Sequence, residues 1–159
     1  MVSKRLLLPL VVFALVIAAC SSDSTTDNST RDDSGTIVEG GDVGVFVLKV
    51  GDCFNEPTAD GAISDVAAVP CDEPHDLQIY AAFDLADGDW PGLETVELDA
   101  ALGCLERFET AIGEPYETSP LDVFPMYPLE EGWNELNDRE VLCSAYNLDG
   151  SKLTGDVLG

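Results

Sequence analysis

Four cysteines in the body of the chain constrain its fold more than any other feature. They are Cys53, Cys71, Cys104 and Cys143. Their spacing contains no C-x-x-C pair and the chain has 1 histidine, so it does not match the ligand spacing of zinc sites. An even number of cysteines outside the cytoplasm indicates two disulfides, for which four thiols allow three pairings. The pairing has to be inferred from the local structure around each cysteine.

The N-terminus indicates that the chain is exported. A short basic start precedes an apolar run from Leu6 to Ala19. That run is shorter than the ~20 residues of a membrane-spanning helix and fits the apolar region of a signal peptide. It closes with Ile17-Ala18-Ala19-Cys20, which resembles a bacterial lipobox. The resemblance implies that residues 1–19 are a lipoprotein signal peptide and that Cys20 carries a diacylglycerol and palmitate anchor. The alternative is a plain signal peptide that happens to end in cysteine.

The composition changes after Cys20. Residues 21–42 contain almost nothing apolar and therefore cannot bury enough surface to offset the entropy of ordering. We expect residues 20–42 to form a lipidated cysteine with a disordered acidic tether, followed by one folded domain at 43–159. The chain has 31 acidic residues against 7 basic ones, which disfavours nucleic acid as a partner. High acidity keeps an exported domain soluble, and it also leaves open a cationic partner or divalent ions.

Local patterns predict the strands near the first two cysteines. Residues 43–50 (VGVFVLKV) are rich in β-branched residues and predict a first strand that ends just before Cys53. Residues 66–69 predict a second strand, and the alternation at 77–83 predicts a third. Turn residues fill the loop between the first two strands. A bridge between two strand ends across such a loop favours the pair Cys53–Cys71.

The second half of the chain predicts one main helix and further strands. Between the turn at 91–92 and Gly113, apolar residues recur at helical spacing: Leu98, Ala101, Leu102, Leu105, Phe108 and Ile112. Cys104 shares this expected buried face, and alternation around Cys143 predicts a strand, so a Cys104–Cys143 bond would pin the helix to the sheet. The stretch after the helix is broken by Pro120, Pro125 and Pro128, which predicts an edge strand at 121–127. We also expect a helical turn at 130–137 with Trp133, and a last strand at 152–158. The predicted fold class is α+β, an antiparallel sheet packed on one main helix and stapled by two disulfides.

Several motifs occur in a recognisable order: LKVGDCF at 48–54, VPCDEPHDLQIY at 69–80, the helix around Cys104, Trp133 with DREVLC at 138–143, and DGSKLTG at 149–155. This order resembles the septum formation domain family of actinobacterial envelope lipoproteins and membrane proteins, over residues 46–159. The resemblance implies an envelope location and a connection with cell division, and it brings no catalytic activity or ligand. Members of the family tend to have glycine before the Asp-Arg pair, where this chain has Asn137. Both residues tolerate positive φ, so we expect the turn to be kept.

His75 is the starting point for an enzyme hypothesis. Nucleophilic cysteine catalysis needs a free thiolate beside a base, and oxidation of Cys71 would remove it. Asp72, Glu73 or Asp76 could instead pair with His75 as an acid–base set. A lone histidine between a proline and a strand is more often a turn residue that hydrogen-bonds the backbone. We therefore expect no catalytic residue and no cofactor.

Two further groups have alternative interpretations. Asp84, Asp87 and Asp89 suggest calcium, but their spacing does not follow an EF-hand loop, so we expect a solvated acidic turn and no metal. Four aromatic residues lie in or near predicted loops, where they can anchor a partner or cover the core: Trp90, Tyr116, Tyr127 and Trp133.

Two function classes remain. The first is a non-catalytic, membrane-anchored extracytoplasmic lipoprotein that docks an envelope protein or a cationic partner. The second is a cell-wall hydrolase or metal-dependent enzyme that uses His75 and nearby carboxylates. The sequence favours the first, and it does not name the partner.

Overall fold

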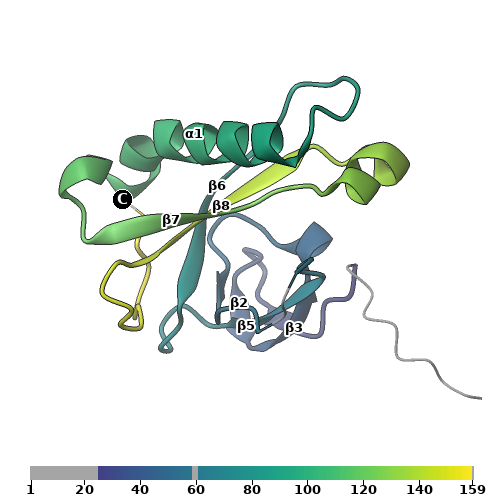
Figure 1. Ribbon diagram of the computed structural model, residues 1–159. Helices are drawn as coiled ribbons and strands as arrows, with labels where there is room; N and C mark the ends of the chain where they lie inside the picture. Colours follow the sequence, from purple (N-terminus) through teal and green to yellow (C-terminus); the bar gives the residue numbers. More distant parts are fainter. Residues whose placement is uncertain (1–24, 59–60, 159) are drawn as a thin grey trace, which may run out of the picture.

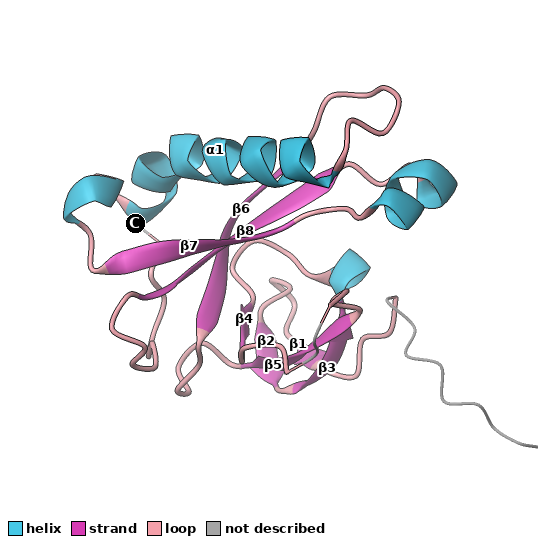
Figure 2. Cartoon of the chain, in the orientation of Figure 1, coloured by secondary structure: helices cyan, strands magenta, loops and turns pink. Residues whose placement is uncertain are grey.

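One helix lies across an antiparallel sheet that curls beneath it (Figure 1, Figure 2). The computed structural model describes residues 25–58 and 61–158. The helix α1 spans Leu93–Ile112, and the six-stranded sheet has the order β3-β5-β4-β6-β8-β7. Neighbouring strands are antiparallel throughout. The predicted α+β class, with one main helix and two disulfides, is confirmed.

The strands are mostly short. The main sheet consists of β3 (Gly41–Gly44), β4 (Cys53–Phe54), β5 (Asp65–Val69), β6 (Leu77–Asp84), β7 (Leu121–Met126) and β8 (Glu140–Asn147). A separate two-stranded sheet is formed by β1 (Thr30–Arg31) and β2 (Ile37–Glu39). Short helical turns occupy Val45–Val47, Tyr116–Thr118 and Gly132–Leu136.

The strands β6 and β8 have a hydrophobic cluster on each face. The first cluster includes Leu77, Ile79 and Leu142, and it lies on the face away from α1. The second includes Tyr80 and Val141, which pack with Phe108 of α1. Because both faces are covered, buried residues form unbroken runs at 77–80 in β6 and at 141–145 in β8, and only the second half of β6 alternates.

The helix is present as predicted, but its buried face is rotated from the expected one. Leu98 and Leu102 are 57% and 51% exposed. The buried residues are Val96, Ala100, Gly103, Cys104 and Phe108. Apolar residues occupy two sides of this helix, so periodicity alone does not select the inner one. Close packing selects it, because a Cβ on Gly103 would overlap the ring of Phe83 on β6.

The predicted first strand at 43–50 is wrong beyond Gly44. The strand β3 ends there, and Val45–Val47 form a 3₁₀ turn. The last pair of the β3–β5 ladder joins Gly44 to Asp65, so the chain after Gly44 has no strand partner. The β-branched pattern is satisfied instead by partial burial of Val45 and Val47 against the first cluster.

Residues 25–42 are folded, which differs from the disordered tether expected for 20–42. They contain β1, β2 and the start of β3, and Ile37 is only 4% exposed. Polar contacts order this segment. Arg31 forms a buried ion pair with Asp52, and the Asp32 carboxylate accepts the Ser34 and Thr36 backbone N–H groups. The predicted signal peptide and Cys20 lie outside the described residues.

In the C-terminal part, two predicted elements are present in the structure and one is not. The strand β7 lies at the edge of the sheet, as predicted, and the helical turn at 130–137 is present with Trp133 buried. The predicted strand at 152–158 is wrong, since only Leu153 forms a bridge, to His75. In this segment, backbone N–H groups bond to side chains where a strand would bond to its neighbour. The Val157 N–H, for example, donates to Gln78 Oε1.

Candidate functional site

Both predicted disulfides are formed. Cys53 joins Cys71 and Cys104 joins Cys143, with Cα–Cα distances of 5.3 and 5.4 Å. The first bond links the start of β4 to the loop after β5, and the second fixes α1 to β8. Cys71 therefore has no thiol with which to act as a nucleophile beside His75.

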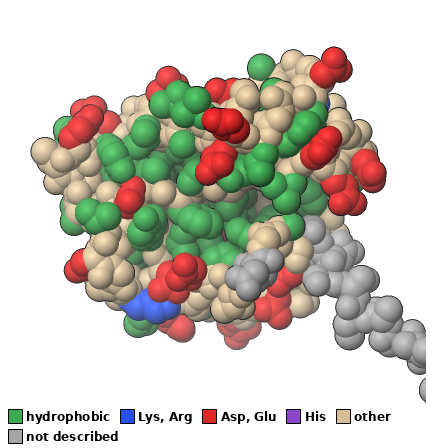
Figure 3. All heavy atoms as spheres, viewed as in Figure 1, with side chains coloured by type: hydrophobic (Ala, Val, Ile, Leu, Met, Phe, Trp, Pro, Cys, Tyr) green, Lys and Arg blue, Asp and Glu red, His purple; other side chains and the backbone are tan. Residues whose placement is uncertain are grey.

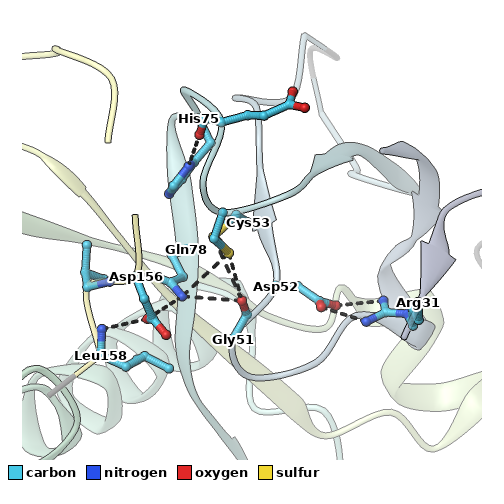
Figure 4. Close-up of a disulfide and its surroundings, with 11 residues drawn as sticks. Arg31, Gly51, Asp52, Cys53, His75, Gln78, Asp156 and Leu158 are labelled. Atoms are coloured by element: carbon cyan, nitrogen blue, oxygen red, sulfur yellow. Dashed lines mark hydrogen bonds and ion pairs between the residues drawn. A yellow bond between two sulfur atoms is a disulfide. The ribbon is translucent and has the colours of Figure 1, made fainter. Parts of the chain in front are cut away.

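His75 is fully buried, and its ring contacts the backbone. Nδ1 lies 2.8 Å from the Glu73 carbonyl oxygen, which can only accept, so Nδ1 carries the proton. The backbone of His75 pairs with Leu153 in both directions. Nε2 is buried and has no hydrogen-bond partner among the described residues. Figure 4 shows His75 next to, but not bonded to, the first disulfide.

The carboxylates near His75 do not converge on its ring. Asp72 and Glu73 are exposed. The Asp76 carboxylate accepts the Lys152 ammonium at 2.6 Å and the Glu56 backbone N–H at 2.9 Å. Burial alone would raise the pKa of Asp76, but these two hydrogen bonds bring it below its ordinary value. The acid–base set considered for an enzyme is therefore not assembled in this structure.

A polar network surrounds the first disulfide instead (Figure 4). The amide of the buried Gln78 donates to the Gly51 carbonyl and to the Asp156 carboxylate. On the other side of Gly51, Asp52 holds Arg31 in a two-pronged ion pair with distances of 2.7 and 2.8 Å. Through these contacts, residues near both ends of the described chain bind the turn before β4. The role of this region is therefore structural.

The acidic turn after β6 is tied to an arginine. Asp87 lies 3.6 Å from Arg139, whose guanidinium stacks 3.7 Å over the Trp133 ring. The indole N–H of Trp133 donates to the Gly88 carbonyl. In the part of the chain that the structure describes, no three His, Cys, Asp or Glu side chains gather as a metal site. These contacts link the turn after β6 to the helical turn before β8.

All four aromatic residues cover the core. The rings of Trp90 and Trp133 meet edge to face at 5.5 Å. Tyr116 packs in the same way on Phe108, and its hydroxyl donates to the Asp122 carboxylate at 2.7 Å. Tyr127 follows β7 and packs against the second cluster, and it also lines the edge of an open hollow.

That hollow is part of an apolar groove which the sequence did not reveal. One hollow of about 250 Å³ is lined chiefly by Val45, Ile63, Phe124, Pro125, Met126, Tyr127 and Leu129. A second of about 250 Å³ shares Phe124 and continues past Leu77 and Tyr146, and a third of about 50 Å³ shares Val45, Met126 and Tyr127. We call these three hollows, which share lining residues, the sheet groove. Figure 3 shows hydrophobic side chains gathered across the hollowed centre of this face.

Acidic side chains surround the sheet groove. Glu56 and Asp76 lie at one end, and Asp138 and Glu140 at the other. Burial, together with the nearby Asp138 and Asp84 carboxylates, raises the pKa of Glu140. Such a surface repels anions and attracts cationic groups. Figure 3 shows the same pattern, with red side chains around the green centre.

A signal for the groove is present in the alternation of β7, but it is incomplete. Phe124 and Met126 pair with Ser144 and Leu142 of β8, so both face the first cluster. The sequence predicts that these side chains share one face of an edge strand. What the pattern does not contain is that β3 and β5 curl over only part of this face.

The chain matches the septum formation family over residues 18–143. This chain belongs to the septum formation family. The match begins well before residue 43, in agreement with the folded segment at 25–42. No match was found among the curated proteins or among the solved structures. Among the described residues, no helix is long and apolar enough to cross a membrane.

The structure gives the septum formation motifs physical roles. The segment at 69–80 forms the disulfide, the His75 turn and the start of β6. Asn137, which stands where glycine was expected from the family, is the only non-glycine residue with positive φ in the described chain, at 55°. It ends the π-helical turn, and the predicted tolerance of this conformation is confirmed.

Proposed function

We propose that this chain is a non-catalytic lipoprotein, anchored on the outer side of an actinobacterial cell membrane, whose domain docks an envelope protein during septum formation. Membership of the septum formation family supports the connection with the septum and with the envelope. The lipobox-like ending at Cys20 supports the anchor. The remaining part, docking, is supported by one feature of the domain.

That feature is the sheet groove. It exposes apolar side chains on a frame held by two disulfides, in a protein of strongly acidic composition. Apolar patches bordered by polar residues mark interaction sites on soluble domains. A rigid frame lowers the entropy lost when a partner binds. A docking module therefore explains the groove better than a core-packing role does.

The docking proposal is tested by photo-crosslinking in the producing cells. A photoreactive phenylalanine analogue replaces Phe124 in the groove, and the same analogue at Leu93, an exposed residue of α1, is the control. We expect a discrete crosslinked product from position 124 that is absent from position 93 and that contains an envelope protein present at the septum. Equal products from both positions, or none from either, would refute docking through this groove.

The anchor is tested separately. Cys20→Ser removes the only sulfur to which a diacylglycerol could be attached at that position. We expect wild-type protein to take up a clickable palmitate analogue and to sediment with membranes, and the variant to do neither. Labelling of the variant would show that the lipid, if any, is attached elsewhere.

The enzyme hypothesis is tested at His75. Because His75 is buried, His75→Ala could unfold the domain, so His75→Gln is made beside it to keep a hydrogen-bond donor for the Glu73 carbonyl and a similar volume. We expect any folded His75 variant to support septum formation at the wild-type level. Loss of function in a variant with normal stability would favour an enzyme.

A further inference from the structure

The outer edge of the sheet at β7 offers no backbone donor to an added strand. The Leu121 N–H donates to Ser119 Oγ at 3.1 Å, and the Val123 N–H donates to Asp122 Oδ1 at 2.8 Å. Pro125, the next residue that faces outward by alternation, has no N–H. Every second residue of β7 is thus capped or lacks a donor, a device that prevents edge-to-edge pairing.

The opposite edge is covered by the chain itself. The Asn28 N–H donates to the Asp42 carbonyl and the Gly44 N–H donates to the Thr26 carbonyl, so residues 26–28 lie along β3. A Cβ on Gly41 would collide with the backbone of Asn28, which shows how close the two segments are. With one edge short of donors and the other covered by the chain itself, strand addition is disfavoured, and we expect a partner to engage side chains.

The open form of the sheet groove suits side chains better than a small molecule. Its two larger hollows, each about 250 Å³, both border Phe124 and are open to solvent. Pockets for drug-sized ligands, in contrast, enclose most of the ligand's surface. An open, elongated and apolar groove of this kind matches the mode in which an amphipathic helix places a row of apolar side chains.

The charge around the groove determines which residues of such a helix should stand beside its apolar row. Of the carboxylates at the rim, Asp76 is paired with Lys152, whereas the rim at the Asp138–Glu140 end has no ion pair among the described residues except that of Arg139 with Asp87. Glu140 is held close to Asp138 and Asp84, and a cation placed there would relieve this repulsion. Lysine or arginine beside the apolar row is the complementary chemistry.

We propose that the occupant of the sheet groove is an amphipathic helix of a partner protein, with leucine-like side chains in the groove and lysine or arginine against the acidic rim. This inference rests on the proposed docking function and specifies its partner. The helix binds through side chains and not through strand addition, because β7 lacks free N–H donors and residues 26–28 cover β3.

The test uses the full chain in mild detergent and three fluorescent peptides of equal length. The first is a helix-forming Leu/Lys peptide, the second has Glu in place of each Lys, and the third is a Val/Lys peptide with strand alternation. We expect the Leu/Lys helix to bind, measured by fluorescence anisotropy, with affinity that falls as salt rises. The Leu/Glu peptide should bind at least tenfold more weakly. Tighter binding by the Val/Lys peptide would overturn the proposed mode.

A matched pair of variants locates the binding. Leu129 in the groove is 41% exposed and Leu93 on α1 is 50% exposed, so both can be changed to serine with little risk to folding. We expect Leu129→Ser to weaken binding of the Leu/Lys helix about tenfold, the loss of one buried leucine contact, and Leu93→Ser to leave it unchanged. Equal effects would show that the peptide binds the acidic surface non-specifically and would refute the site.

The two proposals fail in different ways. If position 124 crosslinks a septal protein but the Leu/Lys helix does not bind, docking stands and the helix occupant is wrong. If position 124 captures nothing in cells, the docking function is refuted, whether or not the Leu/Lys peptide binds.

Discussion

Arg31 orders a segment whose composition is that of a tether. Its guanidinium bonds both oxygens of Asp52 and a further carboxylate at Asp27, and burial leaves it 13% exposed. These hydrogen bonds, that of Asp52 above all, raise the pKa of Arg31, so it stays charged at any pH that the fold survives. Arg31 thus adds to the ordering that the burial of Ile37 supplies in this segment.

Removal of the Arg31–Asp52 ion pair should lower the free energy of unfolding by more than removal of a surface ion pair does. Arg31→Ala leaves the nearly buried Asp52 without its cation, and we expect a loss of about 3 kcal/mol in the free energy of unfolding. Lys49→Ala, at an exposed neighbouring site, is the control and should change it by less than about 0.5 kcal/mol. Urea unfolding followed by circular dichroism measures both. Similar small losses would show that the pair contributes no more than a surface salt bridge.

Asp122 makes stability depend on acid pH. The hydrogen bond from the Tyr116 hydroxyl is the main cause that lowers the pKa of Asp122, and the Val123 N–H and the Tyr146 hydroxyl act in the same direction against burial. A lowered folded-state pKa stabilises the fold above the unfolded value near 4, and this contribution is lost as pH falls further.

We therefore expect Asp122→Asn to unfold about 1 kcal/mol more easily than wild type at pH 7. The difference in free energy of unfolding between the variant and wild type should shrink below pH 4, where the wild-type carboxyl becomes protonated. Asp99→Asn, on the exposed side of α1, is the control and should show no such narrowing. Urea titrations between pH 2 and pH 7 measure the effect. A constant difference across this range would contradict the role of the charge.

At the scale of elements, close packing of α1 on β6 decides which side of the helix is buried. Gly103 lies against the Phe83 ring, and Arg107 stacks 3.9 Å over the same ring. The sequence predicts the helix well because apolar residues recur at its period. It does not predict the orientation, since Leu98 and Leu102 are as apolar as the residues that are buried.

Gly103→Ala tests this contact. Alanine favours a helix by about 1 kcal/mol over glycine in an exposed position. Here the added methyl overlaps the Phe83 ring, so we expect a net loss of about 1–2 kcal/mol. The double variant with Phe83→Leu should recover most of that loss, which thermal unfolding will show. A gain in stability from Gly103→Ala alone would mean that the ring moves without cost.

The same limit applies to the candidate site. Oxidation of Cys71, the edge position of β7 and the turn at Asn137 are all predicted from local residue chemistry. The sheet groove is not, because it depends on how far β3 and β5 curl over β7 and β8. Local patterns contain no measure of that long-range curvature.

At the scale of the whole molecule, two disulfides hold two different parts of the fold. Cys53–Cys71 closes a separation of 18 residues within the β4–β5 region, and Cys104–Cys143 closes 39 residues between α1 and β8. Cys104 and Cys143 are both fully buried, whereas Cys71 is partly exposed. The two bonds should therefore differ in their contribution to stability and in their access to reductant.

Replacement of each pair by alanine separates these contributions. Chain entropy predicts losses of about 3 kcal/mol for the shorter loop and about 4 kcal/mol for the longer one, and the Cys104/Cys143 variant also leaves a core cavity. We expect the larger fall in unfolding midpoint for Cys104→Ala/Cys143→Ala. In wild type, mild reductant followed by mass mapping of alkylated thiols should find Cys53 and Cys71 first. Earlier reduction of the buried pair would contradict this order.

The pairing of the cysteines also has a consequence in time. Each disulfide joins two cysteines that are consecutive in the chain. A chain that emerges from its N-terminus presents Cys71 to Cys53 before Cys104 is available, and Cys104 then waits for Cys143. With Cys20 taken up by the proposed lipid anchor, an oxidant that joins the remaining thiols in their order of appearance would make the native bonds. We therefore expect this domain to mature without a disulfide isomerase.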